Sequence, residues 1–173
     1  MCSRTFGSSQ YDIEALKESI ANYTFDAMEK LRNQESVCNK IDIFFRTSPF
    51  KNTPQHYAYK QIKVSGDTGN SLRVIKYALS AVEEIFRYGF EYKKAGVRIG
   101  GIKDENFSQL SLIEENDTSE SKELMKVIDK INRIYGPRTI KSLSCGVNNE
   151  AWKMNREFKS PSYLTGYGDL PKV

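Results

Sequence analysis

The sequence predicts an α+β fold, in which a four-stranded sheet has two helices on one face and is followed by a small α+β extension. The first observation is the spacing of apolar residues, which alternates between every third or fourth residue and every second residue. The second is the resulting order of strand, helix, strand, strand, helix, strand, which is typical of a split β-α-β arrangement. The third is a polar and acidic stretch at 114–121, which predicts a linker between two units.

The composition fits a globular chain with one ordinary domain and a small appendage. The 173 residues are 39% apolar and 28% charged, enough to bury a core. The sequence has no apolar run of membrane-spanning length and no signal-like start, so we expect a cytoplasmic protein without a membrane partner. Cys2, Cys38 and Cys145 lack metal-ligand spacing and are interpreted as reduced thiols. The net charge of +4 permits a polyanionic partner without requiring one.

The first strand and the first helix are predicted near the start of the chain. Residues 3–7 form a short strand, which Gly7-Ser8-Ser9 is expected to end. A helix follows from Tyr11 to about Arg32, with Ser9 as its cap and acidic side chains in its first turn. Its apolar stripe consists of Ile13, Leu16, Ile20, Tyr23, Ala27 and Leu31.

The remaining sheet strands and the second helix follow from the same reasoning. Ile41, Ile43 and Phe45 alternate with outward residues in a strand that ends at Ser48-Pro49, and a second strand covers 57–65. A helix beginning at 67–69 and ending before Gly89 buries a stripe of Leu72, Ile75, Leu79, Val82 and Phe86. The last strand covers 94–102, with Val97 and Ile99 on one face.

Two helices can cover only one face of this sheet, so the other face is open. Strand alternation predicts that this face displays Arg46, Lys63, Lys94 and Arg98, with Arg4 or its neighbours on the first strand. Gly96 and Gly100 are expected to let a ligand approach the backbone there. Cations with accessible amides fit a phosphate backbone that is bound without sequence preference. An ordinary solvated sheet face would also carry lysines, but the run of positive residues in 92–98 favours nucleic acid.

The second unit is smaller and less regular than the first. A helix carrying Leu124, Ile128, Ile131 and Tyr135 is predicted to stop at Gly136-Pro137, and a short strand is predicted at 139–143. About fifty residues are too few for a deep core, so this unit is expected to lean on the first domain or on a partner.

The sequence contains no recognisable catalytic constellation. His56, the single histidine, is interpreted as an exposed loop residue, and no phosphate-binding loop, nucleophile elbow or metal-ligand cluster is found. The apolar peptide 109–113 is the remaining short motif. By its residues alone it could pack back onto the domain or dock a partner.

Several motifs in register resemble the C-terminal half of the UmuC-type Y-family DNA polymerases. They cover essentially the whole chain and are Ser3-Arg4-Thr5-Phe6-Gly7, Ala27-x-x-Lys30-Leu31-Arg32, Arg46-Thr47-Ser48-Pro49-Phe50, Tyr92-Lys93-Lys94-Ala95-Gly96-Val97, Trp152-x-Met154 and Ser160-Pro161-x-Tyr163. The resemblance implies a little finger domain at 1–113, a linker at 114–121 and a C-terminal extension at 122–173. Leu164 stands where the family has threonine.

The resemblance also implies roles for individual residues. Family strands that contact template phosphates correspond here to Ser3, Arg4, Thr5, Lys93, Lys94 and Arg98; Arg46 and Lys63 are added from the alternation alone. The family's sliding-clamp peptide corresponds to Gln109, Leu110, Ser111, Leu112 and Ile113, where Ile113 replaces the usual aromatic residue.

The implied function is lesion bypass in the bacterial SOS response. The implied partners are damaged or primer–template DNA, the sliding clamp, a UmuD-type accessory subunit and the recombinase filament. The catalytic palm with its two Mg²⁺ ions would precede this stretch, so we expect neither a cofactor nor polymerase activity in the chain itself. The alternative is a protein-docking module with little DNA affinity.

Overall fold

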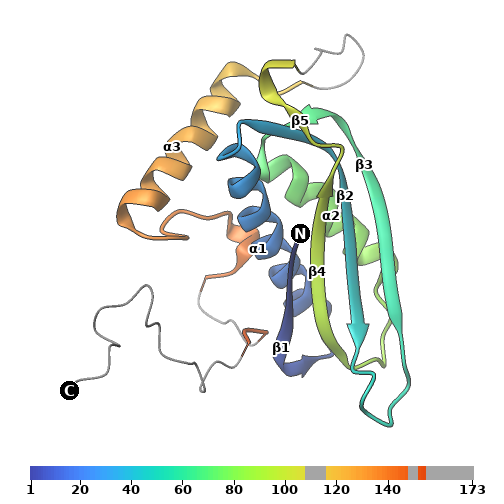
Figure 1. Ribbon diagram of the computed structural model, residues 1–173. Coiled ribbons are helices and arrows are strands. Elements are labelled where there is room, and N and C mark those ends of the chain that lie inside the picture. The colour runs from blue at the N-terminus through green and yellow to red at the C-terminus, as the bar shows by residue number, and fades with distance from the viewer. Residues whose placement is uncertain (108–115, 148–151, 155–173) are drawn as a thin grey trace, which may run out of the picture.

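The part of the chain that the structure describes contains one antiparallel sheet, two long helices behind it and a third helix at one end (Figure 1). The computed structural model describes residues 1–107, 116–147 and 152–154. The sheet strands are β1 (Cys2–Gln10), β2 (Ser36–Thr47), β3 (Tyr57–Thr68) and β4 (Tyr92–Gly100). The helices are α1 (Ile13–Arg32), α2 (Ser71–Ile85) and α3 (Ser119–Tyr135). Shorter elements are β5 (Lys103–Asp104), which pairs with β2, and the 3₁₀ turns η1 (Glu105–Phe107) and η2 (Leu143–Cys145).

The strand order β1-β4-β2-β3 confirms the predicted fold class. Each neighbouring pair is antiparallel, so β1 runs parallel to β2 with β4 between them, and β3 runs parallel to β4 with β2 between them. The chain therefore forms two interleaved split β-α-β units. Helices α1 and α2 both cover the same face of the sheet, and the other face is open (Figure 1).

Helix caps explain where α1 and α2 begin, and they correct two predicted boundaries. Asp12, and not Ser9, caps α1, because its carboxylate accepts a hydrogen bond from the backbone N–H of Glu14. Ser9 instead belongs to β1, which continues through 7–9 with a register shift after Thr5. Asn70 caps α2 by accepting hydrogen bonds from two backbone N–H groups, and α2 ends before the turn at Gly89.

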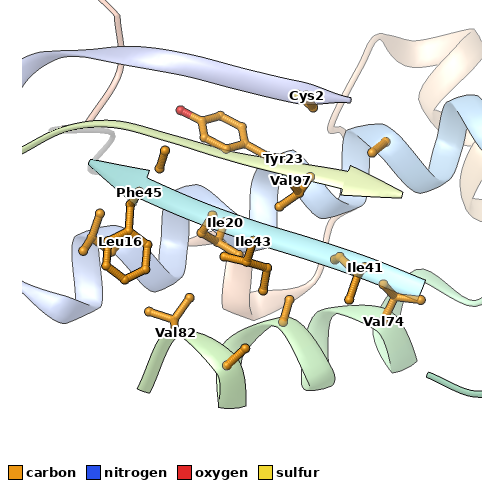
Figure 2. Packing of buried hydrophobic residues seen from close by; sticks show 14 of the residues in the cluster. Cys2, Leu16, Ile20, Tyr23, Ile41, Ile43, Phe45, Val74, Val82 and Val97 are labelled. Carbon is orange, nitrogen blue, oxygen red and sulfur yellow. The ribbon is translucent and has the colours of Figure 1, made fainter. Parts of the chain in front are cut away.

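The core fills the space between the sheet and the two helices (Figure 2). Its central side chains are fully buried and come from both layers: Leu16, Ile20, Ile41, Ile43, Phe45, Val74, Val82 and Val97. Each such aliphatic or aromatic side chain contributes about 1.5–3 kcal/mol when it is removed from water. The predicted apolar stripes and strand alternation therefore account for most of this layer.

Helix α3 packs on the first domain largely through polar groups, which the apolar pattern did not predict. The side chains of Asp129 and Arg32 form a two-point ion pair, with Nε–Oδ2 and Nη2–Oδ1 distances of 2.7 Å. Near the start of α3, Asp117 accepts hydrogen bonds from the Thr68 hydroxyl (2.7 Å) and from the backbone N–H of Gly69 (2.8 Å). Asp117, in the middle of the predicted acidic linker at 114–121, therefore anchors that segment to the first domain.

The rest of the extension also contacts α1 and β1. Asn22 donates a hydrogen bond to the backbone carbonyl of Cys145, and the Trp152 ring packs edge-on against Tyr23 with ring centroids 5.6 Å apart. The predicted strand at 139–143 is wrong, because this segment is irregular and leads into the 3₁₀ turn η2. Among the described residues, no helix is long and apolar enough to cross a membrane.

Candidate nucleic-acid interface

The open face of the sheet is organised in four rows of side chains that run across the strands. Residues paired directly across two strands point to the same face, so the register defines each row. The rows are Thr5, Lys94, Arg46 and Tyr57; Ser3, Gly96, Phe44 and Tyr59; Arg98, Asp42 and Gln61; and Gly100, Lys40 and Lys63. Four of the predicted cations, Arg46, Lys63, Lys94 and Arg98, are therefore on one face.

Two of these rows place like charges directly opposite each other. Arg46 pairs with Lys94, and Lys40 pairs with Lys63. Like charges at such positions destabilise a sheet, since their Cβ atoms are only about 4.5–5.5 Å apart. Within residues 1–107, 116–147 and 152–154, none of Lys40, Arg46 and Lys94 forms an ion pair with a carboxylate. A bound polyanion would remove the repulsion between Arg46 and Lys94.

The third row is different, because its cation already has an acidic partner. The Asp42 carboxylate is 2.5 Å from Arg98 Nη2 and accepts a hydrogen bond of 2.9 Å from Gln61. The hydrogen bond of 2.5 Å that Arg98 Nε donates to Asp42, and the negative charge of Asp42, raise the pKa of Arg98. The Asp42 side chain is 6% exposed and that of Arg98 is 58% exposed, so the guanidinium extends to the surface above a buried anion. The alternation in β2 placed Asp42 outward, but it could not predict this pairing.

Gly96 does not open the sheet to a ligand as predicted. A Cβ atom at this position would overlap Ser3 Cβ and lie 2.7 Å from Phe44 Cζ. The Phe44 ring and the Ser3 side chain therefore occupy the space that the missing side chain leaves. Gly100 is less crowded, since a Cβ atom there would lie 3.5 Å from Lys40 Cβ.

The strand register also separates Arg4 and Lys93 from the four rows. Arg4 pairs with buried Ala95 and so lies on the helix side of the sheet, which corrects its expected placement, while its neighbours Ser3 and Thr5 are on the open face. Lys93 is the extra residue at a register shift in β4, and its ammonium group donates to the backbone carbonyl of Gly7 at 2.9 Å.

The open face also contains residues that were not predicted as site residues. Lys40 completes the fourth row, and the exposed rings of Tyr57 and Tyr59 are 62% and 46% accessible along the edge strand β3. The alternation in β2 and β3 could have identified all three. The predicted clamp-binding residues 109–113 lie outside the described residues.

His56 is not the exposed loop residue that was predicted. Its ring stacks on Phe90 with centroids 4.7 Å apart, and its Nδ1 atom is 2.9 Å from the Tyr92 hydroxyl. Burial, and secondly the charge of Arg87, lower the pKa of His56. No cluster of three potential metal ligands occurs among the residues that the structure describes.

Comparison with known families agrees with this arrangement of elements. A model described as the impB/mucB/samB family C-terminal domain matches residues 1–112. The chain belongs to the impB/mucB/samB family. In this impB/mucB/samB chain, a second model, described as a domain of unknown function (DUF4113), matches residues 122–173.

Individual relatives of this impB/mucB/samB chain confirm the resemblance to UmuC-type proteins. Protein UmuC of Salmonella typhimurium is 34% identical over 175 residues, which cover 100% of this chain and 41% of that protein. Protein SamB of the same species is 34% identical over 99% of the chain and 40% of SamB. DNA polymerase IV of Clostridium acetobutylicum is 25% identical over 75% of the chain and 31% of its own length. The chain thus spans about two fifths of the UmuC and SamB proteins.

Proposed function

We propose that this chain is the DNA-gripping region of a bacterial error-prone translesion polymerase, acting in the cytoplasm during the SOS response. The observation that carries the proposal is the pair of like-charge rows, Arg46 with Lys94 and Lys40 with Lys63. Similarity to a protein named DNA polymerase IV and to UmuC supports a DNA substrate for the whole protein. Polymerisation, with its Mg²⁺ ions, is assigned to the remainder of such a protein and not to this region.

The geometry of the open face suits a phosphate backbone. Lys40 and Arg46 are six residues apart on one strand, a separation of about 20 Å at the usual rise of a β-strand. DNA carries one phosphate per 3.4 Å of axis on each strand, so a duplex along β2 would offer about six phosphates of one strand over this distance. Binding through lysine and arginine releases condensed counterions and is independent of sequence. Thr5 and Ser3 are placed to donate hydrogen bonds at the β1 edge.

Removing one like-charge row tests this proposal. We expect Arg46→Gln with Lys94→Gln to weaken binding to a primer–template duplex by about 10-fold or more at low salt. The slope of log K against log salt should become shallower by about 0.9 for each lost phosphate contact. Fluorescence anisotropy with a labelled duplex at several salt concentrations measures both quantities.

The control for this experiment is Lys76→Gln, which removes an exposed lysine on α2, away from the open face. This change should leave both the affinity and the salt slope close to those of the unchanged chain. If only net charge mattered, the control, which loses one charge, would lose about half as much in log affinity as the double variant, which loses two. A loss of that size in the control would mean that the proposed interface is wrong.

We also propose that Gln109, Leu110, Ser111, Leu112 and Ile113 tether the protein to the sliding clamp. Support comes from the sequence: a glutamine leads an apolar peptide just beyond the last sheet strand. Replacing Gln109, Leu110 and Leu112 with alanine should abolish capture by immobilised clamp and leave DNA affinity unchanged. Undiminished capture would show that this peptide does not bind the clamp. The accessory UmuD-type subunit and the recombinase filament are proposed as further partners of the whole protein.

A further inference from the structure

The open face of the sheet carries aromatic rings as well as cations. Phe44 on β2 lies directly opposite Tyr59 on β3, and Tyr57 lies two residues before Tyr59 on the same face. Together these three residues form the aromatic strip. None of them belongs to the hydrophobic core, because α1 and α2 pack against the other face of the sheet (Figure 1). Their presence on this face therefore has no explanation in the packing of the domain.

The rings of the aromatic strip are available to a flat ligand. Tyr57 is 62% exposed and Tyr59 is 46% exposed, while Phe44 is half-buried. Within the part of the chain that the structure describes, none of the three rings pairs with another aromatic ring. On the helix side, by contrast, Phe45 and Tyr92 meet edge-on with centroids 4.8 Å apart.

Gly96 lets the aromatic strip extend across the sheet. The ring of Phe44 reaches from β2 over Gly96 on β4, since a Cβ atom at position 96 would lie 2.7 Å from Phe44 Cζ and 2.8 Å from Phe44 Cε1. Any larger residue at this position would push the ring away from the sheet. The strip is therefore an apolar surface that spans β3, β2 and β4.

Positive side chains border the aromatic strip on two sides. On one side, Arg46 lies directly opposite Tyr57 and also opposite Lys94. On the other side, the next row across the strands contains Arg98, whose side chain is 58% exposed. A single nucleic-acid strand offers flat bases and negatively charged phosphates, and proteins bind it with aromatic rings in a positively charged groove. The aromatic strip and its borders provide this combination.

We propose that the aromatic strip stacks the bases of single-stranded DNA, an inference that rests on the proposed function and extends it. Bases within a duplex already stack on one another, so only unpaired bases offer a free face to the rings. Stacking accepts every base, since each has a π-face, and so it agrees with binding that ignores sequence. The open face then binds the unpaired template next to the duplex, with Arg46 and Lys94 on its phosphates.

Tyr57→Leu with Tyr59→Leu tests the proposal, because it removes both exposed rings and keeps apolar side chains. Fluorescence anisotropy of the full chain with a labelled thymidine oligonucleotide is measured at several salt concentrations. We expect the affinity to fall about tenfold or more, since two stacking contacts are lost. The slope of log K against log salt should stay the same, because no phosphate contact is removed.

A blunt duplex of the same length is the second substrate for this variant. Its affinity should change by less than about twofold, because its paired bases do not stack on the rings. An unchanged affinity for the single strand would overturn the proposal. An equal loss for the duplex, or a shallower salt slope, would also overturn it, since the tyrosines would then act on the backbone.

Two control variants separate stacking from other effects. Tyr57→Phe with Tyr59→Phe keeps both rings, so single-strand affinity should stay within about twofold, and a loss as large as that of the leucine variant would overturn the proposal. Tyr88→Leu with Tyr135→Leu removes two exposed tyrosines that lie outside the sheet and should have no effect. An equal loss in this variant would also overturn the proposal. Urea unfolding verifies that each variant remains folded.

Failure of this proposal is distinguishable from failure of the proposed function. The proposed function is tested on a duplex with Arg46→Gln and Lys94→Gln, whereas stacking is tested on a single strand with the tyrosine variants. If the charge variant weakens duplex binding while the leucine variant keeps its single-strand affinity, the DNA interface stands and only the stacking proposal is overturned.

Discussion

Gly96 is the most crowded backbone position of the open face, and its substitution tests the packing there. A methyl group on Gly96 would overlap Ser3 and approach Phe44 Cζ to 2.7 Å. We therefore expect Gly96→Ala to lower the free energy of unfolding by about 1–3 kcal/mol, as overpacking usually does. Urea denaturation measures this change.

Gly100→Ala provides the matched control, because the added methyl group would make only an ordinary contact, 3.5 Å from Lys40 Cβ. Its unfolding free energy should stay within about 1 kcal/mol of the original, near the usual cost of replacing glycine. Equal destabilisation by both substitutions would contradict the assigned contact between Phe44 and Gly96.

For single residues, the alternation of side chains along the strands predicted on which face of the sheet most site residues lie, but it did not predict which residues they contact. A period of two residues fixed which side chains of β2, β3 and β4 share a face, so Arg46, Lys63, Lys94 and Arg98 were placed correctly. For β1 the alternation left open whether Arg4 or its neighbours face outward, because the phase of this edge strand depends on its pairing with β4, which places Ser3 and Thr5 there. The Asp42–Arg98 ion pair joins two strands far apart in sequence, and no local pattern encodes it.

Among the elements, α3 depends on the ion pair between Asp129 and Arg32. The two side chains are only 11% and 12% exposed, and Arg32 also donates to the carbonyl of Gly69 and to the Ser71 hydroxyl. Removing one partner of a buried pair leaves an uncompensated charge, which costs about 3–5 kcal/mol. Asp129→Ala should therefore release α3 from the first domain, and hydrogen exchange should become faster over 119–135.

Lys130→Ala is the control for this prediction, since Lys130 is an exposed neighbour of Asp129 on the same helix. Exchange in α3 should remain slow in this variant. If Asp129→Ala also left α3 protected, the contacts at Asp117 would be sufficient to hold the helix.

The elements differ in how well their sequences predicted them. The spacing of apolar residues revealed both α1 and α2, and the predicted stripe of α1 is mostly buried. The predicted stripe of α2 is partly wrong, because Leu72 is 40% exposed, and the helix packs through Val74, Ile75, Ala78, Ala81 and Val82. Helix α3 was also predicted, but its buried side chains are Met125, Asp129 and Asn132, while Leu124 is 49% exposed and Tyr135 is 75% exposed. Its orientation follows from ion pairs and hydrogen bonds, which an apolar pattern does not describe.

Across the whole molecule, His56 makes stability depend on pH just below neutrality. Its folded pKa lies below the ordinary value of 6.5, so the unfolded chain binds this proton at a higher pH than the folded chain. The contribution of neutral His56 is present above pH 6.5 and is lost as the pH falls through that value towards the folded pKa. We expect the free energy of unfolding to decrease over this window.

His56→Gln should flatten this decrease, and urea denaturation at a series of pH values measures it. Hydrogen bonds from Tyr11 and then Lys51 lower the pKa of Glu91, so its contribution to stability is present above its ordinary value of 4.5 and is lost only below that value. The two pH windows are therefore separate. An identical slope in the His56→Gln variant would show that another group titrates there.

The pairing of β1 with β4 has a consequence for biosynthesis. Cys2 opposes Val97, so β1 leaves the ribosome well before β4, the strand with which it pairs. At a synthesis rate of roughly 5–20 residues per second, that delay is roughly 5–20 s. During this interval β4 has not yet been made, so neither β1 nor β2 can form its hydrogen bonds to that strand. Nascent chains of this region are therefore expected to depend on chaperones until the sheet closes.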